Sequence, residues 1–233
     1  MPVVDSDGIL VGIVTVDDVI DVAEEETTED MQLMAGMDAL DDYYSQTSVY
    51  EMVRKRVGWL ILLFIGQMFT ATAMGAYESV IAGAVFLSLF IPMIISSGGN
   101  SGSQAATLII RALSTDDIRM DDWKRILGRE FVSGLFLGGL LGFLGFFVIV
   151  AYGYATGEPL TIELLLSALV VSLSLVGVVL FGNLSGSMLP FILSKMGLDP
   201  AVTSAPFVST LVDVTGIVIY FSIAVALLKG VVF

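Results

Sequence analysis

The sequence contains neither cysteine nor histidine among its 233 residues. Without cysteine the chain can form no disulfide framework, no thiolate metal site and no cysteine nucleophile. Without histidine it lacks the usual zinc ligand and the commonest general base. A bound metal ion must therefore be held by oxygen, which favours magnesium, calcium or manganese.

Charged residues are also scarce. They make up 15% of the chain, whereas 56% of its residues are hydrophobic and the mean hydropathy is +0.90. Soluble domains average about 25% charged and about 45–50% apolar residues, so this composition predicts a membrane protein. Basic residues are missing altogether from residues 1–53, which carry 14 acidic side chains and account for the whole net charge of −14. The chain thus divides into an acidic leader and an apolar, electrically balanced remainder.

Long stretches with almost no charge follow the leader. Because roughly 20 apolar residues cross the hydrocarbon core, they predict an all-α membrane protein with five transmembrane helices and a membrane domain over residues 57–233. Four of the stretches carry no charge, and the fifth is interrupted only by Asp213. The five stretches are Val57–Tyr77, Ser79–Ile110, Phe131–Gly157, Leu164–Ser194 and Pro200–Leu228.

The basic residues predict the orientation in the membrane. Nine of the ten lie before the first span, between spans two and three, or between spans four and five, all on one side. The opposite loops, near Glu78 and over residues 153–158, carry none, and only Lys229 follows the last span. Because cytoplasmic loops carry an excess of Lys and Arg, we expect a multi-pass protein of the cell membrane. Its N-terminus is predicted to be cytoplasmic and its C-terminus extracytoplasmic.

Two spans are longer than a bilayer requires. The 32 residues of Ser79–Ile110 would form a helix of about 48 Å, against a hydrocarbon core of about 30 Å. They contain Pro92 and the small polar run Ser96–Gln104, which we interpret as broken backbone facing protein or a water-filled cavity. The fourth span contains Gly182–Ser187 and Pro190, and there we favour close helix packing through small residues.

Asp213 is the only ionisable side chain inside a span. A carboxylate near the bilayer midplane costs at least about 2.5–3.5 kcal/mol, and such residues usually face a water-filled path or a partner. No Lys or Arg lies within a span, so the counter-charge would be a proton or a passing cation. Ser209 and Thr210 add oxygen ligands nearby, and Pro206 is expected to free backbone carbonyls one turn earlier.

A single carboxylate per chain gives a divalent ion few protein ligands and only one negative charge. Magnesium keeps several waters while one or two carboxylates hold it. A two-fold dimer with two copies of Asp213 at its axis would supply a charge of about −2 to a hydrated ion. The alternative is a protonated Asp213 that is hydrogen-bonded to a neighbouring helix.

The leader begins with the pattern of a strand, a turn at Asp5–Gly8 and a second strand. Thr15 is placed to cap a helix that starts at Val16, and we expect a second helical stretch from about residue 28 to 54. Eight acids crowd residues 17–30. They form either a solvated face or a latch, in which divalent ions bridge the leader to Asp199 and hold it closed.

Several motifs together resemble the MgtE family of magnesium channels or transporters, and the resemblance covers essentially the whole chain. No single glycine motif carries the resemblance, whereas the ordered set does. The leader also looks like the closing part of a CBS repeat. The motifs are Pro92 followed by Gly98–Leu113, Met188–Phe191, Leu198–Ala201 leading through Pro206 to Asp213–Gly216, and, in the leader, Gly12–Val19.

The resemblance implies a homodimer with one central pore, lined mainly by spans two and five. Asp213 matches the pore acid that binds magnesium, and Asn100 lies in the pore-helix motif. Residues 1–27 would be the end of a CBS repeat and residues 28–56 an acidic connecting, or plug, helix. Cytosolic magnesium would bind the acids of this region and close the pore. The acids that match these regulatory positions are Asp18, Asp21, Glu26, Glu29, Asp30 and Asp199.

Family members usually carry a helical N-domain and two CBS repeats before the membrane part, and only the tail of the last repeat is expected here. Thr15 and Asp18 match a nucleotide-contact pattern of CBS repeats, so Asp18 has two competing roles. A nucleotide would need the rest of the repeats to bind. We expect magnesium gating to be weaker than in a full-length chain.

Other functions fit the residues less well. A CBS-regulated anion channel is disfavoured because a lone membrane carboxylate repels anions. An intramembrane aspartyl protease needs two carboxylates that share a proton, which only two copies of Asp213 would supply. A purely structural anchor has no use for Asp213. We expect no enzyme activity and no nucleic-acid partner. The sequence leaves open whether the protein is a channel or a coupled carrier. It also leaves open whether the protein selects magnesium, manganese, cobalt or calcium.

Overall fold

The computed structural model describes residues 1–157 and 159–229. Glu158 and the last four residues fall outside that part. The predicted extracytoplasmic location of the C-terminus therefore concerns residues outside the described part. Five helices in the described part are long and apolar enough to span a bilayer. They confirm the prediction of an all-α, multi-pass membrane protein. The spans are α2 (Val49–Ala76), the region Val85–Ser114, Met120–Ala155 with α6 (Trp123–Ala155), α7 (Ile162–Lys195) and α8 (Ala205–Leu228).

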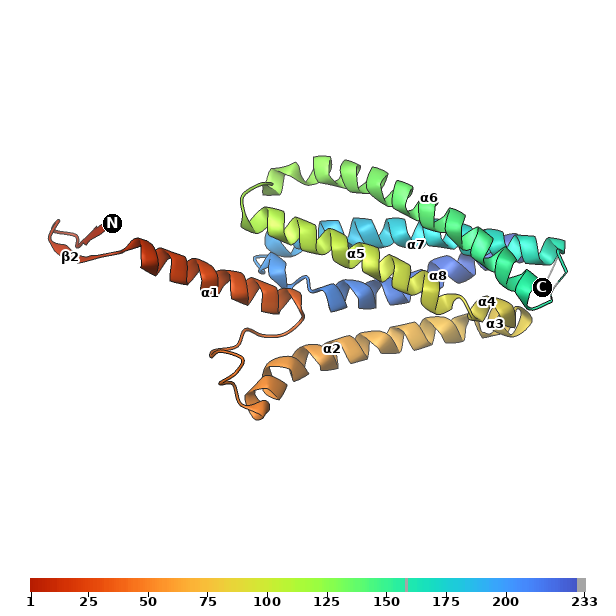
Figure 1. Cartoon of the computed structure of the whole chain (residues 1–233), viewed down its shortest axis with the longest axis horizontal. Helices are drawn as coiled ribbons and strands as arrows, with labels where there is room; N and C mark the ends of the chain where they lie inside the picture. Colours follow the sequence, from red (N-terminus) through yellow and green to blue (C-terminus); the bar gives the residue numbers. More distant parts are fainter. Residues whose placement is uncertain (158, 230–233) are drawn as a thin grey trace.

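The leader extends away from the helical bundle (Figure 1). Strands β1 (Pro2–Val4) and β2 (Leu10–Ile13) pair antiparallel, and α1 (Val16–Met34) follows. The Thr15 side chain accepts a hydrogen bond from the Asp18 backbone N–H, and the Asp18 carboxylate accepts one from the Thr15 N–H. This reciprocal cap fixes the start of α1, as the sequence predicted.

The expected helix over residues 28–54 is wrong. Helix α1 ends at Met34, and the chain is irregular up to Ser48, which caps α2. The Gln32 side chain accepts a hydrogen bond from the Leu40 backbone N–H at 2.7 Å, and Lys55 pairs with Asp41 at 2.9 Å. Polar side chains therefore hold the segment between α1 and α2 in place of a regular helix.

Helix α7 lies at the centre of the bundle, with α5 (Ile91–Ser114), α6 and α8 packed around it. Many of the fully buried side chains, such as Val170, Val178 and Ile217, come from α7 and α8. Helix α2 lies along the outside against α8, and none of its residues is buried (Figure 1).

Glycines let α5 and α7 touch through their backbones. A Cβ added to Gly182 would overlap the carbonyl of Gly98, and one added to Gly102 would lie 2.8 Å from the carbonyl oxygen of Gly182. The packing interpretation of Gly182–Ser187 is thus confirmed. The interpretation of Ser96–Gln104 as broken backbone is wrong: α5 is continuous through it, because its small residues fit against α7.

The second span is instead interrupted nearer its start. The short helices α3 (Glu78–Gly83) and α4 (Val85–Ser88) precede α5, and Ala84 between them is not helical. The buried hydroxyl of Tyr220 donates to the backbone carbonyl of Leu87 at 2.8 Å. This bond satisfies a carbonyl near the interruption, as buried backbone requires.

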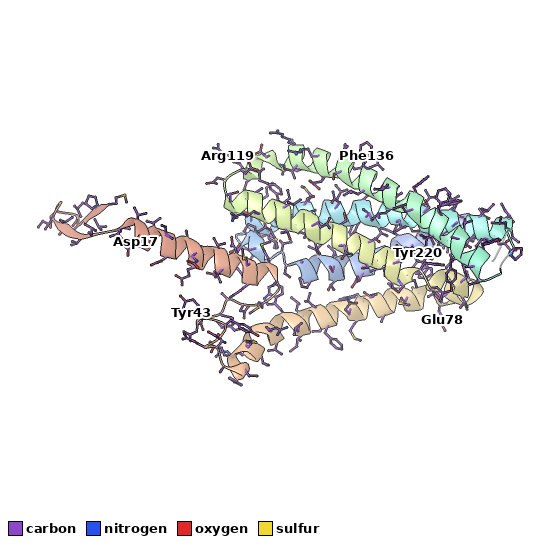
Figure 2. All side chains as sticks on the ribbon, in the orientation of Figure 1. Asp17, Tyr43, Glu78, Arg119, Phe136 and Tyr220 are labelled. Atoms are coloured by element: carbon purple, nitrogen blue, oxygen red, sulfur yellow. The ribbon has the colours of Figure 1, made fainter. Side chains whose placement is uncertain are left out.

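The two ends of the bundle differ in charge, as the basic residues predict. Figure 2 places Arg119, in the loop between α5 and α6, and Glu78, at the start of α3, at opposite ends. The basic loops and the loops without basic residues therefore lie at opposite ends of the bundle. Which end faces the cytoplasm stays a prediction.

Candidate cation site

Asp213 lies in the ninth position of α8 and faces α2. Its side chain is half-buried, and its carboxylate accepts a hydrogen bond from Nε2 of Gln67 at 2.5 Å. A carboxylate in a helix that spans the membrane needs such a partner, because leaving it unpaired in a low dielectric is costly. The sequence pattern alone does not reveal the role of Gln67, although it is the only amide in the first span.

A cavity of about 430 Å³ opens beside this carboxylate. Helix α5 supplies one wall and α8 the other, while α2 adds Gln67 and Thr70. Three of the four residues expected at the site, Asp213, Ser209 and Asn100, line it together. Its lining residues are Gln67, Thr70, Met74, Ile91, Pro92, Ile95, Ser96, Gly99, Asn100, Ser209, Asp213 and Ile217.

Small residues bring the two main walls together. A Cβ on Gly99 would lie 3.3 Å from Oγ of Ser209, and the hydroxyls of Ser103 and Ser209 lie 3.3 Å apart. The side chain of Asn100 is exposed on the same stretch of α5. The polar run Ser96–Gln104 is thus helical. One of its faces packs against α7, and another presents the polar atoms of Ser96 and Asn100 to the cavity.

Thr210 does not line the cavity. Its hydroxyl donates to the backbone carbonyl of Pro206 at 3.0 Å, and its methyl group lies against Gly66 of α2. The expected release of carbonyls at Pro206 is also wrong. Pro206 stands in the first turn of α8, where the missing N–H has no helical partner to lose.

A second polar cluster joins three helices away from Asp213. The buried Asn183 of α7 donates to both the backbone carbonyl and the carboxylate of Glu130 in α6, at 2.8 and 2.7 Å. It also accepts from the hydroxyl of Ser101 in α5 at 3.2 Å. The sequence motif assigns Asn183 only to close helix packing. An amide inside an apolar span is nevertheless a signal of a hydrogen bond between helices.

The acidic leader approaches the membrane part through α1. Asp30 and Asp199 line one cavity of about 690 Å³, together with Asp116 and Arg119. Burial, then the charge of Asp199 and then that of Glu26, raise the pKa of Asp30, while Arg111 lowers it. Asp199 therefore lies beside the leader, as the sequence suggested.

The other regulatory acids are not gathered there. Asp18, Asp21, Glu26 and Glu29 are exposed along α1, and the 12 positions from residue 18 to residue 30 span about 18 Å of helix. Among the described residues no three acidic side chains converge on one point that would hold a metal ion. The structure thus brings Asp30 and Asp199 to one cavity and leaves the other four acids on exposed parts of α1.

The cap also bears on the nucleotide contact expected at Thr15 and Asp18. The Asp18 carboxylate already accepts from the backbone N–H and the hydroxyl of Thr15, both at 2.7 Å. These bonds hold the pKa of Asp18 below its ordinary value. A ribose hydroxyl would have to compete with them for the same oxygen.

In the part of the chain that the structure describes, five helices that are long and apolar enough to span a bilayer, with a half-buried carboxylate beside a cavity between three of them, define a multi-pass membrane protein. Residues 91–223 match the model of a family described as "MgtE: Divalent cation transporter". The match covers more than half of the chain, and the chain belongs to the MgtE family. The resemblance drawn from the sequence motifs is thereby confirmed.

Proteins of known function agree with this assignment. The chain is 45% identical to "Magnesium transporter MgtE" of Thermus thermophilus over 99% of its own length and 49% of that protein. It is 36% identical to the protein of the same name from Enterococcus faecalis, over 96% of this chain and 47% of that one. The chain spans about half the length of the curated relatives it matches. Their names describe transporters and not enzymes.

Proposed function

We propose that the protein moves magnesium ions across the membrane along a path lined by α5 and α8. The observation that carries the proposal is the half-buried carboxylate of Asp213 beside a cavity that half of its lining residues supply with polar side chains. The names of the relatives support magnesium as the cargo. Magnesium suits an oxygen-only site, because it prefers carboxylates and water to nitrogen or sulfur.

The size of the cavity supports a hydrated ion. Six waters occupy about 180 Å³ at roughly 30 Å³ each, and the cavity measures about 430 Å³. Asn100 and Ser209 offer polar side chains that can bond to waters of the ion, while Asp213 supplies the charge. A site of this kind does not require the ion to lose its waters, which magnesium gives up reluctantly.

We propose a homodimer as the working unit. Each chain contributes one carboxylate to the cavity, whereas one or two usually hold a magnesium ion. In a dimer with a two-fold axis beside Asp213, the second copy of Asp213 would be the second carboxylate.

We also propose that magnesium regulates the path through the leader, with the N-terminus in the cytoplasm. A divalent ion between Asp30 and Asp199 would neutralise two facing carboxylates and hold α1 against the membrane part. Its loss would restore the repulsion and release α1. Residues 1–27 would act as the end of a CBS repeat in this arrangement.

Uptake into sealed liposomes tests the transport proposal. Wild-type protein should admit magnesium and exclude chloride, both followed by trapped fluorescent indicators. Asp213→Asn should reduce magnesium uptake at least tenfold, and Glu78→Gln, which removes an exposed acid outside the cavity, should leave it unchanged. Undiminished selective uptake by Asp213→Asn, or chloride entry through the wild type, would contradict the proposal.

A further inference from the structure

Trp123 begins α6 at the basic end of the bundle. It packs on a small apolar cluster of Ile109, Ile126 and Phe191, separate from the main core. A helix of 33 residues, such as α6, measures about 50 Å, and a bilayer with its headgroups is about 40–45 Å thick. Because α6 is long enough to cross a bilayer together with both headgroup layers, we infer that its first turn reaches headgroup level, where Trp is enriched in membrane proteins.

Two lysines converge on this ring from different helices. The ammonium groups of Lys124, in α6, and Lys195, at the end of α7, each lie 5.5 Å from the centroid of the Trp123 ring. Both lysines are exposed. The one ion pair among the described residues joins Lys55 and Asp41, so no acid neutralises either lysine within 4.0 Å.

The acid nearest to Trp123 in the sequence is engaged elsewhere. Asp122 precedes Trp123, and its carboxylate accepts a hydrogen bond from the backbone N–H of Arg119 at 2.9 Å. It caps the short η1 helix (Met120–Asp122) in this way. Beyond Lys124 the same face of α6 turns apolar: Phe131 and Leu135, seven and eleven residues further along the helix, are both exposed.

We propose that Trp123, Lys124 and Lys195 bind the phosphate headgroup of an anionic phospholipid. The two ammonium groups would contact the phosphate, the indole would lie among the headgroups, and the acyl chains would run along the exposed apolar face of α6. The occupant is a lipid because cations and an apolar face adjoin at headgroup depth. A free phosphate ion would use the lysines alone.

The two tryptophans of the chain allow a direct test. In a Trp59→Phe background, Trp123 is the only tryptophan, and its fluorescence reports the lipid beside it. The protein is reconstituted in bilayers that contain either brominated phosphatidylglycerol or brominated phosphatidylcholine, since bromine quenches indole on contact. We expect the anionic lipid to occupy the site about tenfold more favourably, because each lysine near the surface favours an anionic lipid.

Variants separate this site from general surface charge. Lys124→Gln combined with Lys195→Gln should bring the preference down to about one, whereas Lys229→Gln, at the other end of the bundle, should keep it. Folding is checked by magnesium uptake and by thermal unfolding in detergent. Equal quenching by the two lipids in the Trp59→Phe protein, or an unchanged preference in the double variant, would overturn the proposal.

Free phosphate is tested in the same samples. Inorganic phosphate at millimolar concentration should leave the quenching by brominated phosphatidylglycerol unchanged, since it cannot use the apolar face. Sodium sulfate at matched ionic strength controls for screening. If phosphate alone abolishes the preference, the site binds the free anion and the lipid assignment is wrong.

Discussion

Gln67 of α2 donates a hydrogen bond to Asp213 of α8 at 2.5 Å. The bond ties the outermost helix, which has no buried residue, to the one carboxylate that faces the membrane cavity. The amide supports the acid without a positive charge, so a cation in the cavity meets a carboxylate that no internal ion pair has neutralised.

Replacing Gln67 by lysine should abolish magnesium uptake. An ammonium group in place of the amide would neutralise Asp213 from within and repel a divalent ion. Gln67→Met, which removes the hydrogen bond and adds no charge, should keep a measurable fraction of the wild-type rate in liposomes. Equal uptake by the lysine and methionine variants would show that charge at Asp213 does not govern the path.

Gly182→Ala should destabilise the bundle by about 1–3 kcal/mol, as overpacking does. The added methyl would overlap the carbonyl of Gly98 and force α5 and α7 apart. Gly139→Ala is the matched control, because a Cβ there meets nothing within 4 Å and alanine gains about 0.5–1 kcal/mol in a helix. Unfolding in detergent compares the two, and similar stabilities would refute the tight backbone contact.

Asn183→Leu should cost about 2 kcal/mol of stability. It removes three hydrogen bonds to α5 and α6, and bonds between membrane helices average about 0.6 kcal/mol each. Ser101→Ala removes one of them and should cost about a third as much. Ser185→Ala, whose hydroxyl bonds only within α7, should change little. A loss no larger in Asn183→Leu than in Ser185→Ala would mean that the cluster does not join the helices.

Asp30→Asn should raise the melting temperature by about 1–2 °C at pH 7 in the absence of divalent ions. Burial and the charge of Asp199 raise the pKa of Asp30 above its ordinary value of 3.8. The folded state therefore binds this proton more tightly, and the resulting stability is present below pH 3.8 and lost as pH rises through the raised pKa.

The same variant tests the regulatory proposal. The gain from Asp30→Asn should shrink at pH 4 and also when magnesium is added at pH 7, because a proton or a cation then relieves the repulsion in the wild type. Glu25→Gln, on an exposed part of α1, is the control. A gain that is independent of both pH and magnesium would contradict a cation between Asp30 and Asp199.

The sequence predicted the spans and the membrane acid because both follow from composition. Uncharged runs mark the helices, and a single Asp within them marks the site. The helical state of Ser96–Gln104 was not predictable in this way. Glycine and serine break an isolated helix, but here Gly98 and Gly102 are matched to glycines on α7, and only the fold brings those partners together.

Two further misses have the same origin. The Gln67 bond joins positions that lie 146 residues apart, so no local pattern reveals it. Thr210 stands one residue from Ser209, yet the turn of α8 directs it toward Gly66 rather than the cavity.

The end of α1 at Met34 has a local cause instead. Gly36 adopts a φ of +77°, and its N–H group donates to the carbonyl of Leu33. The N–H group of Met37 donates to the carbonyl of Gln32. This glycine was therefore an available signal of the helix end.

The central claim is that Asp213 holds a hydrated magnesium ion. An experimental density map of the protein in lipid with magnesium, repeated with manganese for its anomalous signal, tests it most directly. We expect an octahedral ion between Asp213 and Asn100, about 4 Å from the carboxylate oxygens because a bound water intervenes. A carboxyl group that contacts only Gln67, beside a cavity filled by apolar side chains, would contradict the account.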